Sequence, residues 1–424
     1  MLIEFNATNY RSIRDTQTLT MAASKYYRGM EETNCFDSSV PGLAKLLRTA
    51  VIYGPNAGGK SNLMRALHFM QAFVLSSHAH QEGQRINVSP FALAEVARNK
   101  PSEFEVFFVQ DHVRYQYGFA VSPTRITREW LLAYPEGKAQ RWFERAYDQN
   151  SDKENWYFGS KFTGRKQLWQ EATRKNALFL STAIQLNNEQ LKPVFNWFQH
   201  TLAILLPKAP INLKFSLDQC ETEEGKSRIM EFLKSADLTI AGIDVKKIKV
   251  PFAPGILPAD MPQEAKDKIT RDMQDKEIPL IFFQHRDDHG ELVPINLSDE
   301  SDGTQKLFAF AGPWLDVFAK GRILFVDEMD TSLHPLLVRF LVENFHNSAV
   351  NKNNAQLIFT THDTSVLDAD LFRRDQIWFV EKDQSNATKL YPLSDFSPRK
   401  GEALEKWYLK GRYGALPFIG DLRV

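Results

Sequence analysis

The stretch TAVIYGPNAGGKS (residues 49–61) decides how the rest of this sequence is interpreted. Residues 49–53 are apolar or β-branched, so they predict a short buried strand. Residues 54–61 match the pattern G-x-x-x-x-G-K-S in full. Residues 61–77, SNLMRALHFMQAFVLSS, then carry apolar side chains at helical spacing. The order strand, glycine-rich loop and helix is the local context in which such a loop wraps a phosphate group.

The residues of this loop suit a nucleoside triphosphate. Small side chains let several backbone N–H groups point at one phosphate, and Lys60 would neutralise the β- and γ-phosphates. Ser61 begins the helix, where its hydroxyl would hold Mg²⁺. A simple glycine-rich turn is the alternative, but a strand and a helix flank the loop as the motif requires. The predicted nucleotide-binding residues are Gly54, Asn56, Gly58, Gly59, Lys60, Ser61 and Asn62.

A second motif is ILFVDE (residues 323–328), in which four apolar residues precede two carboxylates. Ligands in open α/β sheets bind at the carboxyl ends of strands, which is where this acidic pair would lie. We expect Asp327 to meet the metal, directly or through water, and Glu328 to polarise the water that attacks the γ-phosphate. An acidic turn without function becomes improbable beside the phosphate loop.

Three further segments are weak signals when taken singly. Ser301 and Gly303 lie in the polar segment SDGTQ, which also reads as an ordinary helix cap. His362 ends the apolar run LIFTTH, and a lone histidine at such a place is more often structural. The segment MDTSLHP (residues 329–335) follows directly after the acidic pair.

Taken in chain order, these features resemble the ABC-type ATPase head, in its soluble SMC-like and OLD-like branch. The resemblance implies active sites shared between two subunits, with Ser301 and Gly303 of one subunit touching the γ-phosphate held by the other. It implies that His362 is a γ-phosphate switch and that residues 330–334 meet the partner subunit. Tyr10, Arg11 and Ser12 match the polar strand that such heads place near the adenine. The segment ESDGT departs from the LSGGQ of transporters.

More narrowly, the chain resembles AAA-type ATPases of prokaryotic abortive-infection and anti-phage systems, such as the RloA, PARIS AriA and Septu PtuA ATPases. The likeness also rests on NYRSI (9–13), SPFAL (89–93), YGFAV (117–121) and KGRYGALP (410–417). It implies a homodimer or higher homo-oligomer that uses ATP and Mg²⁺ and controls a separately encoded nuclease or toxin effector, with a phage protein as candidate trigger. OLD nucleases carry a Toprim domain after the ATPase, and the residues after His362 are too few for one.

Composition excludes several classes of protein. The 424 residues include 52 Lys plus Arg and 52 Asp plus Glu, so the chain is not polybasic and any DNA contact needs a local patch. Only two cysteines occur and no CxxC, which leaves no zinc-finger or disulfide framework. No apolar run approaches the roughly 18 residues that span a bilayer. We therefore expect a cytoplasmic protein without membrane contact.

Strands alternating with helices from residue 278 onward predict an α/β fold with a parallel sheet. The predicted fold is a P-loop NTPase of ABC-ATPase head type, with a mixed or parallel sheet, an antiparallel β-subdomain and a helical insertion. The predicted parts are an N-terminal lobe with antiparallel strands within 86–147 (1–160), the insertion (161–277) and a C-terminal lobe (278–424). Within them, 191–206 is predicted as one helix, 251–277 as a loop and charged helix, and 278–285 as a strand of the parallel sheet.

Other functions remain open at this point. A DNA repair or recombination ATPase of RecF or SMC-like type would share the head and need a basic track, although a solvated helix face is the preferred interpretation of those charges. A scaffold that binds ATP without hydrolysing it is disfavoured by the two carboxylates, and a transporter subunit by the long gap between Lys60 and Asp327. The candidate track comprises Lys161, Arg165, Lys166, Arg174, Lys175, Lys246, Lys247 and Lys249.

Overall fold

The computed structural model describes residues 1–27, 29–206, 213–236, 238–249, 261–263, 266–267, 270, 277–398 and 401–417. The chain divides into two compact units. The first unit comprises residues 1–209 and 317–424, and the second comprises residues 210–316. The first unit therefore joins the two ends of the sequence, while the second is inserted between them.

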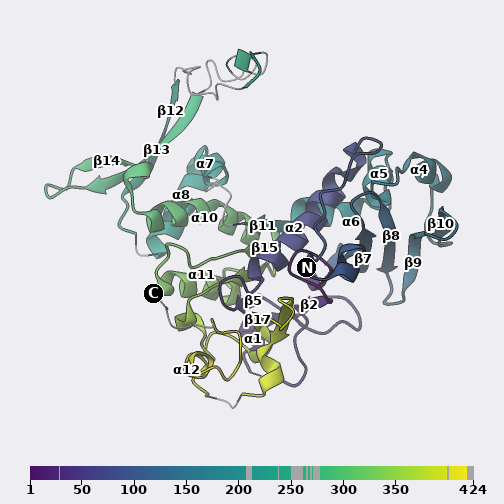
Figure 1. Cartoon of the computed structure of the whole chain (residues 1–424). Coiled ribbons are helices and arrows are strands. Elements are labelled where there is room, and N and C mark those ends of the chain that lie inside the picture. Colours follow the sequence, from purple (N-terminus) through teal and green to yellow (C-terminus); the bar gives the residue numbers. More distant parts are fainter. Residues whose placement is uncertain are drawn as a thin grey trace, which may run out of the picture. The chain divides into compact units, whose positions relative to one another are not determined.

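A seven-stranded antiparallel sheet in the first unit has the strand order β10-β9-β8-β7-β6-β1-β2 (Figure 1). Buried and more exposed side chains alternate along β6, as expected where one face of a sheet lies on the core. The predicted antiparallel sheet is confirmed, and it continues to residue 158. Its strands are β1 (Leu2–Thr8), β2 (Gln17–Thr20), β6 (Ser102–Gln110), β7 (Val113–Val121), β8 (Ile126–Tyr134), β9 (Gln140–Asp148) and β10 (Lys153–Phe158).

A six-stranded sheet in the same unit has the order β11-β15-β16-β5-β17-β18. All its pairs are parallel except β17 with β18. Every residue of β5, β15 and β16 is buried, which is the pattern of strands covered on both faces. Its strands are β5 (Thr49–Tyr53), β11 (Leu202–Leu205), β15 (Ile323–Val326), β16 (Gln356–Thr360), β17 (Ile377–Lys382) and β18 (Thr388–Pro392), and a separate pair is β3 (Cys35–Phe36) with β4 (Leu46–Leu47).

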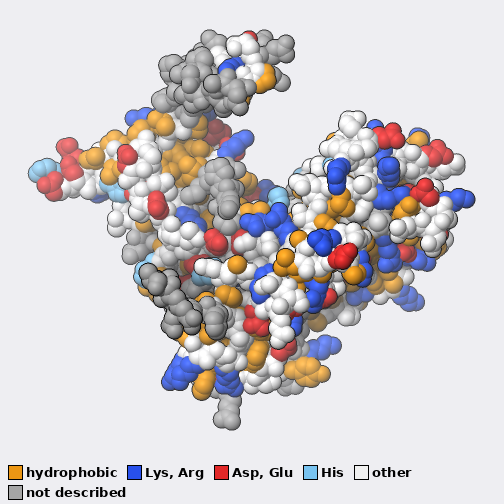
Figure 2. All heavy atoms as spheres, viewed as in Figure 1, with side chains coloured by type: hydrophobic (Ala, Val, Ile, Leu, Met, Phe, Trp, Pro, Cys, Tyr) orange, Lys and Arg blue, Asp and Glu red, His pale blue; other side chains and the backbone are white. Residues whose placement is uncertain are grey.

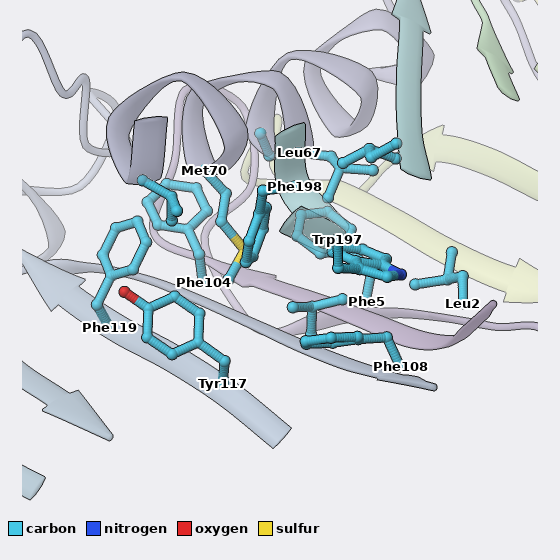
Figure 3. Packing of buried hydrophobic residues seen from close by; sticks show 14 of the residues in the cluster. Leu2, Phe5, Leu67, Met70, Phe104, Phe108, Tyr117, Phe119, Trp197 and Phe198 are labelled. Carbon is cyan, nitrogen blue, oxygen red and sulfur yellow. The ribbon is translucent and has the colours of Figure 1, made fainter. Parts of the chain in front are cut away.

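Helix α2 (Lys60–Ser76) shares one hydrophobic core with both sheets. Figure 3 shows Leu67 and Met70 of α2 in one cluster with Phe104, Phe108 and Phe119 of the antiparallel sheet. The helix that follows the phosphate loop is thus fixed by packing. The other helical segments of this unit are α1 (Glu31–Asn34), η1 (Ser77–Ala79), α3 (Glu95–Arg98), α4 (Lys166–Ala172), α5 (Phe179–Gln185), α6 (Lys192–Asn196), α11 (Pro335–His346), η5 (Thr364–Val366), η6 (Arg374–Gln376), η7 (Leu393–Phe396) and α12 (Leu404–Leu409).

The segment 191–206 is not the single helix that its apolar pattern predicts. Helix α6 gives way to a π-helical turn, η2 (Trp197–Thr201), and the chain then extends into β11. The buried Trp197 ring stacks on Phe108 with centroids 4.3 Å apart. The Gln71 side chain of α2 donates to the carbonyl oxygens of Phe198 and Leu202 at 2.7 and 2.8 Å. Tertiary packing and pairing with β15 therefore override the local helical pattern.

Helices α4, α5 and α6 belong to the first unit, so the division into units differs from the predicted insertion of 161–277. The fully buried Glu129 of β8 explains part of this: its carboxylate accepts the N–H groups of Phe179 and Leu180, which begin α5, at 2.7 and 3.0 Å. Arg145 of β9 pairs with the same carboxylate at 3.1 Å. Apolar side chains of α5 and α6 belong to the same hydrophobic core as those of the antiparallel sheet.

The second unit contains a three-stranded antiparallel sheet, in the order β12-β13-β14. Residues 278–285 lie in β13, so the prediction that they join the parallel sheet is wrong: a strand pattern does not reveal which strands pair. Most of the predicted loop and charged helix of 251–277 lies outside the described residues. The elements are α7 (Lys214–Cys220), α8 (Glu223–Ser235), β12 (Gly242–Lys249), β13 (Glu277–Arg286), β14 (Leu292–Asn296), η4 (Leu297–Asp299) and α10 (Asp302–Lys320), which ends in the first unit.

Across the described ranges, none of the helices combines the length and the apolar character that crossing a lipid bilayer requires.

Candidate active site

The strand order of the parallel sheet brings the predicted motifs to one edge. Strand β16 lies between β5, which leads into the phosphate loop, and β15, which leads into the acidic pair. Parallel strands end at the same side of a sheet, so Gly54, Asp327 and His362 follow neighbouring carboxyl ends. This is the place where open α/β sheets bind ligands.

Two glycines of the loop are required by their surroundings. A Cβ at Gly54 would overlap the carbonyl oxygen of Val380 in the neighbouring strand β17. Gly59 has φ +119°, a conformation that favours glycine, and a Cβ there would overlap the Thr388 hydroxyl. Gly58 is buried between them, whereas Asn56 at the tip of the loop is exposed. The tight loop therefore depends on glycine for both space and backbone conformation.

A hydrogen-bonded brace from distant segments holds this loop. The hydroxyl of Thr388, in β18, donates to the carbonyl oxygen of Gly58 at 3.1 Å and lies 2.8 Å from the Ser12 hydroxyl. Asn62, in the first turn of α2, donates to Ser12 at 2.7 Å. The predicted residue Asn62 and the segment NYRSI thus contribute by fixing the loop.

Lys60 is 5% exposed, and its ammonium donates to the carbonyl oxygen of Gly54 at 2.7 Å. Burial lowers the pKa of Lys60 to about 8, and the carboxylates of Asp327, Asp330 and Glu328 oppose that change. The Lys60 Nζ lies 3.5 Å from Nδ1 of His362. Partial burial, followed by the charge of Lys60, lowers the pKa of His362, which favours the neutral imidazole. The structure thus brings the loop lysine, the acidic pair and the histidine together.

Thr360, the last residue of β16, orients the acidic pair. Its buried hydroxyl donates to Oδ1 of Asp327 at 2.6 Å and accepts the backbone N–H of Glu328 at 2.8 Å. Its carbonyl oxygen accepts the N–H of Met329 at 3.0 Å. Glu328 has φ +54°, a sparsely populated conformation for a residue with a side chain. One threonine therefore holds three consecutive residues in the turn that aims the two carboxylates.

Two carboxylate oxygens at this edge suit a cation. Oδ2 of Asp327 and Oδ1 of Asp330 are buried and have no hydrogen-bond partner among the described residues. Oδ2 of Asp330 accepts the N–H of His362 at 3.2 Å. Ser61, half-buried, begins α2 beside Lys60. No group of three Asp, Glu, His or Cys side chains in the described part of the chain could hold a metal alone, but Mg²⁺ usually takes one or two carboxylates together with substrate phosphates. These residues fit Mg²⁺ bound with a nucleotide.

The segment after the acidic pair is ordered by its own capping contacts. The Leu336 N–H donates to Nδ1 of His334 at 3.3 Å, and Pro335 begins α11. Ser332, at φ +61°, and Leu336 are exposed. The SLHP loop therefore presents a defined surface next to Asp330.

Ser301 and Gly303 lie in the second unit, at the start of α10. The Ser301 hydroxyl accepts the Thr304 N–H at 3.2 Å, which is an N-cap contact, and the Ser301 side chain is exposed. Glu300, where the sequence departs from the transporter pattern, pairs with His285 of β13 at 2.7 Å. That pairing fixes the loop that leads into Ser301.

Asn9, next to Tyr10 and Arg11, explains why NYRSI and SPFAL occur together. Its amide donates to the carbonyl oxygens of Ala97, Lys100 and Pro101 at 2.8–3.2 Å, and its Oδ1 accepts the Phe91 N–H at 3.1 Å. Tyr10 is buried against Phe69 and Phe104, and Arg11 is exposed beside the Tyr10 hydroxyl. The segment contributes to the core of the unit, with Arg11 exposed and Ser12 half-buried.

Thr360 and Thr388 are the site residues that sequence reasoning missed. Two adjacent threonines at the end of the buried run LIFTT were an available signal, because a hydroxyl at the end of a buried strand needs a partner. Thr388 gave no local signal, since it meets Ser12 across 376 positions.

Fold and site together define a P-loop ATPase of ABC head type: a glycine-rich loop with a lysine, an acidic strand end and a histidine at one edge of a parallel sheet. The family model described as "AAA domain, putative AbiEii toxin, Type IV TA system" matches residues 50–368, and the chain belongs to this family. Among curated proteins, no sequence matches the chain.

Solved structures similar to the chain include SMC heads. One is an SMC head bound to the C-winged helix domain of ScpA, with 12% identity, 92% of this chain and 97% of that chain covered, and a TM-score of 0.40. Another is the SMC head domain from Thermotoga maritima, with 10% identity, coverages of 92% and 98%, and a TM-score of 0.39. The likeness is loose, and the assignment of the fold rests on the strand order and the family match.

Proposed function

We propose that this chain is an ATP-binding and ATP-hydrolysing switch subunit of an anti-phage, abortive-infection system, which controls a separately encoded nuclease or toxin effector. The observation that carries the enzymatic part is the Thr360-held acidic pair beside the buried Lys60. The family description, with its reference to a toxin of a type IV toxin–antitoxin system, supports the defence part.

In this proposal the loop N–H groups and Lys60 bind the β- and γ-phosphates. Ser61 and Asp327 would hold Mg²⁺, which when bound would supply positive charge beside the phosphates. Glu328 accepts a proton from the attacking water, and the backbone turn held by Thr360 aims it. His362 donates to the γ-phosphate from its place beside Lys60 and Asp330.

The proposal includes a second copy of the chain. The exposed Ser301 directly precedes a 19-residue helix and the half-buried Gly303 lies in its first turn. The N-terminal N–H groups and the dipole of such a helix favour an anion. Supplied by one copy, Ser301 and Gly303 would close over the γ-phosphate held by the other. Binding would then dock two heads, and hydrolysis through Glu328 would release them, which is the change an effector can sense.

Glu328→Gln tests the enzymatic part. We expect the variant to bind a fluorescent ATP analogue as the parent does, while turnover falls by about 100-fold or more, because general-base catalysis contributes about 10²–10⁴. Glu343→Gln, an exposed carboxylate of α11, is the matched control and should turn over normally. Hydrolysis by the Glu328 variant at the parent rate would show that the base is another group.

The defence part is tested in cells that carry the gene with its neighbouring reading frames. We expect a phage to plate less efficiently on these cells, and Lys60→Ala to restore plating. Equal protection by the parent and the Lys60 variant would exclude an ATP-driven switch. Protection that persists after every neighbouring frame is deleted would exclude the separate effector.

A further inference from the structure

Aromatic rings and cations alternate on a surface that the nucleotide site does not use. We define the α12 surface by its exposed or half-buried members: Lys25, Tyr26, Tyr27, Arg374, Lys406, Trp407, Lys410 and Arg412. In Figure 2 blue Lys and Arg side chains and orange hydrophobic side chains meet at the lower left, over the segment labelled α12 in Figure 1.

The rings and cations of this surface are in contact. The centroid of the Trp407 ring is 5.3 Å from the Lys410 ammonium and 5.2 Å from the Arg412 guanidinium. The Arg374 guanidinium lies 5.6 Å from the Tyr27 ring. The buried Tyr413 connects the two pairs, since Arg412 is 5.9 Å from its ring and the charges of both Arg412 and Arg374 act on its hydroxyl.

Buried side chains pack beneath this surface. Tyr408, the buried neighbour of Trp407 in α12, stacks on Phe379 of β17 with centroids 5.3 Å apart. The buried Arg373–Asp375 pair fixes the loop that carries Lys25 and Tyr26, because Asp375 accepts the Ser24 N–H at 2.8 Å. The rings of Tyr26 and Trp407 are nevertheless 93% and 36% exposed. Exposed aromatic rings beside cations, carried by a packed scaffold, favour a site where a ligand binds.

The charge of the surface decides the class of ligand. It carries five cations, of which Arg412 is paired with Glu402. The half-buried Glu405 accepts the Thr364 hydroxyl at 2.8 Å, so cations outnumber acids at this surface. An acidic protein segment would satisfy the cations alone. Unpaired nucleotides match both the rings and the cations of the surface. Every base offers a flat π-face to an aromatic ring, and every phosphate offers a negative charge to Lys or Arg.

We propose that the α12 surface binds single-stranded nucleic acid, by stacking bases on Trp407 and Tyr26 and by pairing phosphates with Lys410 and its neighbouring cations. Duplex is excluded from this mode, because its bases are already stacked on one another. This inference goes beyond the proposed ATPase and does not depend on it.

Fluorescence anisotropy with labelled oligothymidylate and oligouridylate of about 20 nucleotides tests the proposal on the full chain. At about 50 mM salt we expect binding that weakens steeply with salt, with a slope near −0.7 for each phosphate contacted. If the surface recognises only bases and phosphates, the two oligonucleotides should bind with similar affinity. A preference for oligouridylate would identify single-stranded RNA, and not DNA, as the ligand of this surface. Absence of binding to both would overturn the proposal.

Matched variants locate the binding. Trp407→Ala should weaken it by about 10-fold, as expected for the loss of one stacked base, and Trp407→Phe should recover most of it. Lys410→Glu should weaken binding and reduce the salt slope, whereas Lys161→Glu and Lys175→Glu, the same charge change around α4, should not. Unchanged ATP turnover in all five variants controls for folding. If only the α4 variants lose binding, or if a labelled Glu-rich peptide competes better than the oligonucleotides, the proposal is wrong.

Discussion

Thr360→Val is the perturbation whose effect follows most directly from the structure. Valine keeps the shape of threonine and removes the hydroxyl that donates to Asp327 at 2.6 Å and accepts from Glu328 at 2.8 Å. A hydrogen bond to a charged group contributes about 1.5–3 kcal/mol. Asp327 would then be buried with fewer partners, and the strained turn at Glu328 would lose its support. If the variant loses about 2 kcal/mol of stabilisation of the transition state for hydrolysis, turnover falls by about 30-fold.

Steady-state ATP turnover over a range of Mg²⁺ concentrations is the assay. We expect Thr360→Val to lower kcat and to require more Mg²⁺ for half-maximal rate, while binding of a fluorescent ATP analogue without Mg²⁺ stays unchanged, because Lys60 and the loop are untouched. Thr360→Ser keeps the hydroxyl and should restore most of the rate. If Thr360→Val turns over normally, or if the serine variant is as impaired as the valine variant, Thr360 does not position the acidic pair.

Two further predictions concern other parts of the molecule. Gly59→Ala should weaken ATP binding by at least about 10-fold, because the added Cβ would overlap Thr388 and because strain at such a φ costs about 1–3 kcal/mol. Gly290→Ala is the control, since Gly290 also has a positive φ but lies in open space. This control variant should bind ATP normally in the same titration. Burial lowers the pKa of His346 to about 3 in the folded protein, whereas the unfolded chain has the ordinary pKa of 6.5. Between these two pH values only the unfolded chain takes up a proton on this residue, so the folded state loses stability as the pH falls below 6.5. Between pH 7 and 5 the loss is about 2 kcal/mol, at about 1.4 kcal/mol per pH unit, and denaturant unfolding of His346→Gln should lack this component; identical pH profiles for the parent and the variant would contradict it.

The parts of the fold that short-range patterns encode could be predicted from the sequence. Strand β5, the loop at 54–61 and the start of α2 follow one another within a few residues, and each has a distinct chemical pattern. The place of Asp327 at a strand end follows likewise from four apolar residues and a carboxylate. These features arise from local burial and backbone geometry, which adjacent residues determine.

Other features depend on contacts between distant residues. The brace of Ser12 and Thr388 joins opposite ends of the chain, and the π-helical turn at Trp197 arises because its ring packs on Phe108. Strand β13 looks like any other apolar strand, and only pairing with β12 and β14 distinguishes its sheet. A single sequence carries little information about such partners, so these features require the structure.

The central claim is that two copies of the chain complete each other's ATP site. Mixing Lys60→Ala with Ser301→Arg, each expected to be inactive alone, tests it most directly. A mixed dimer has one site with an intact loop from one copy and an intact Ser301 from the other, so an equal mixture should recover about a quarter of the parent turnover. Turnover that stays at the level of the separate variants, while light scattering shows that the copies associate, would contradict the claim.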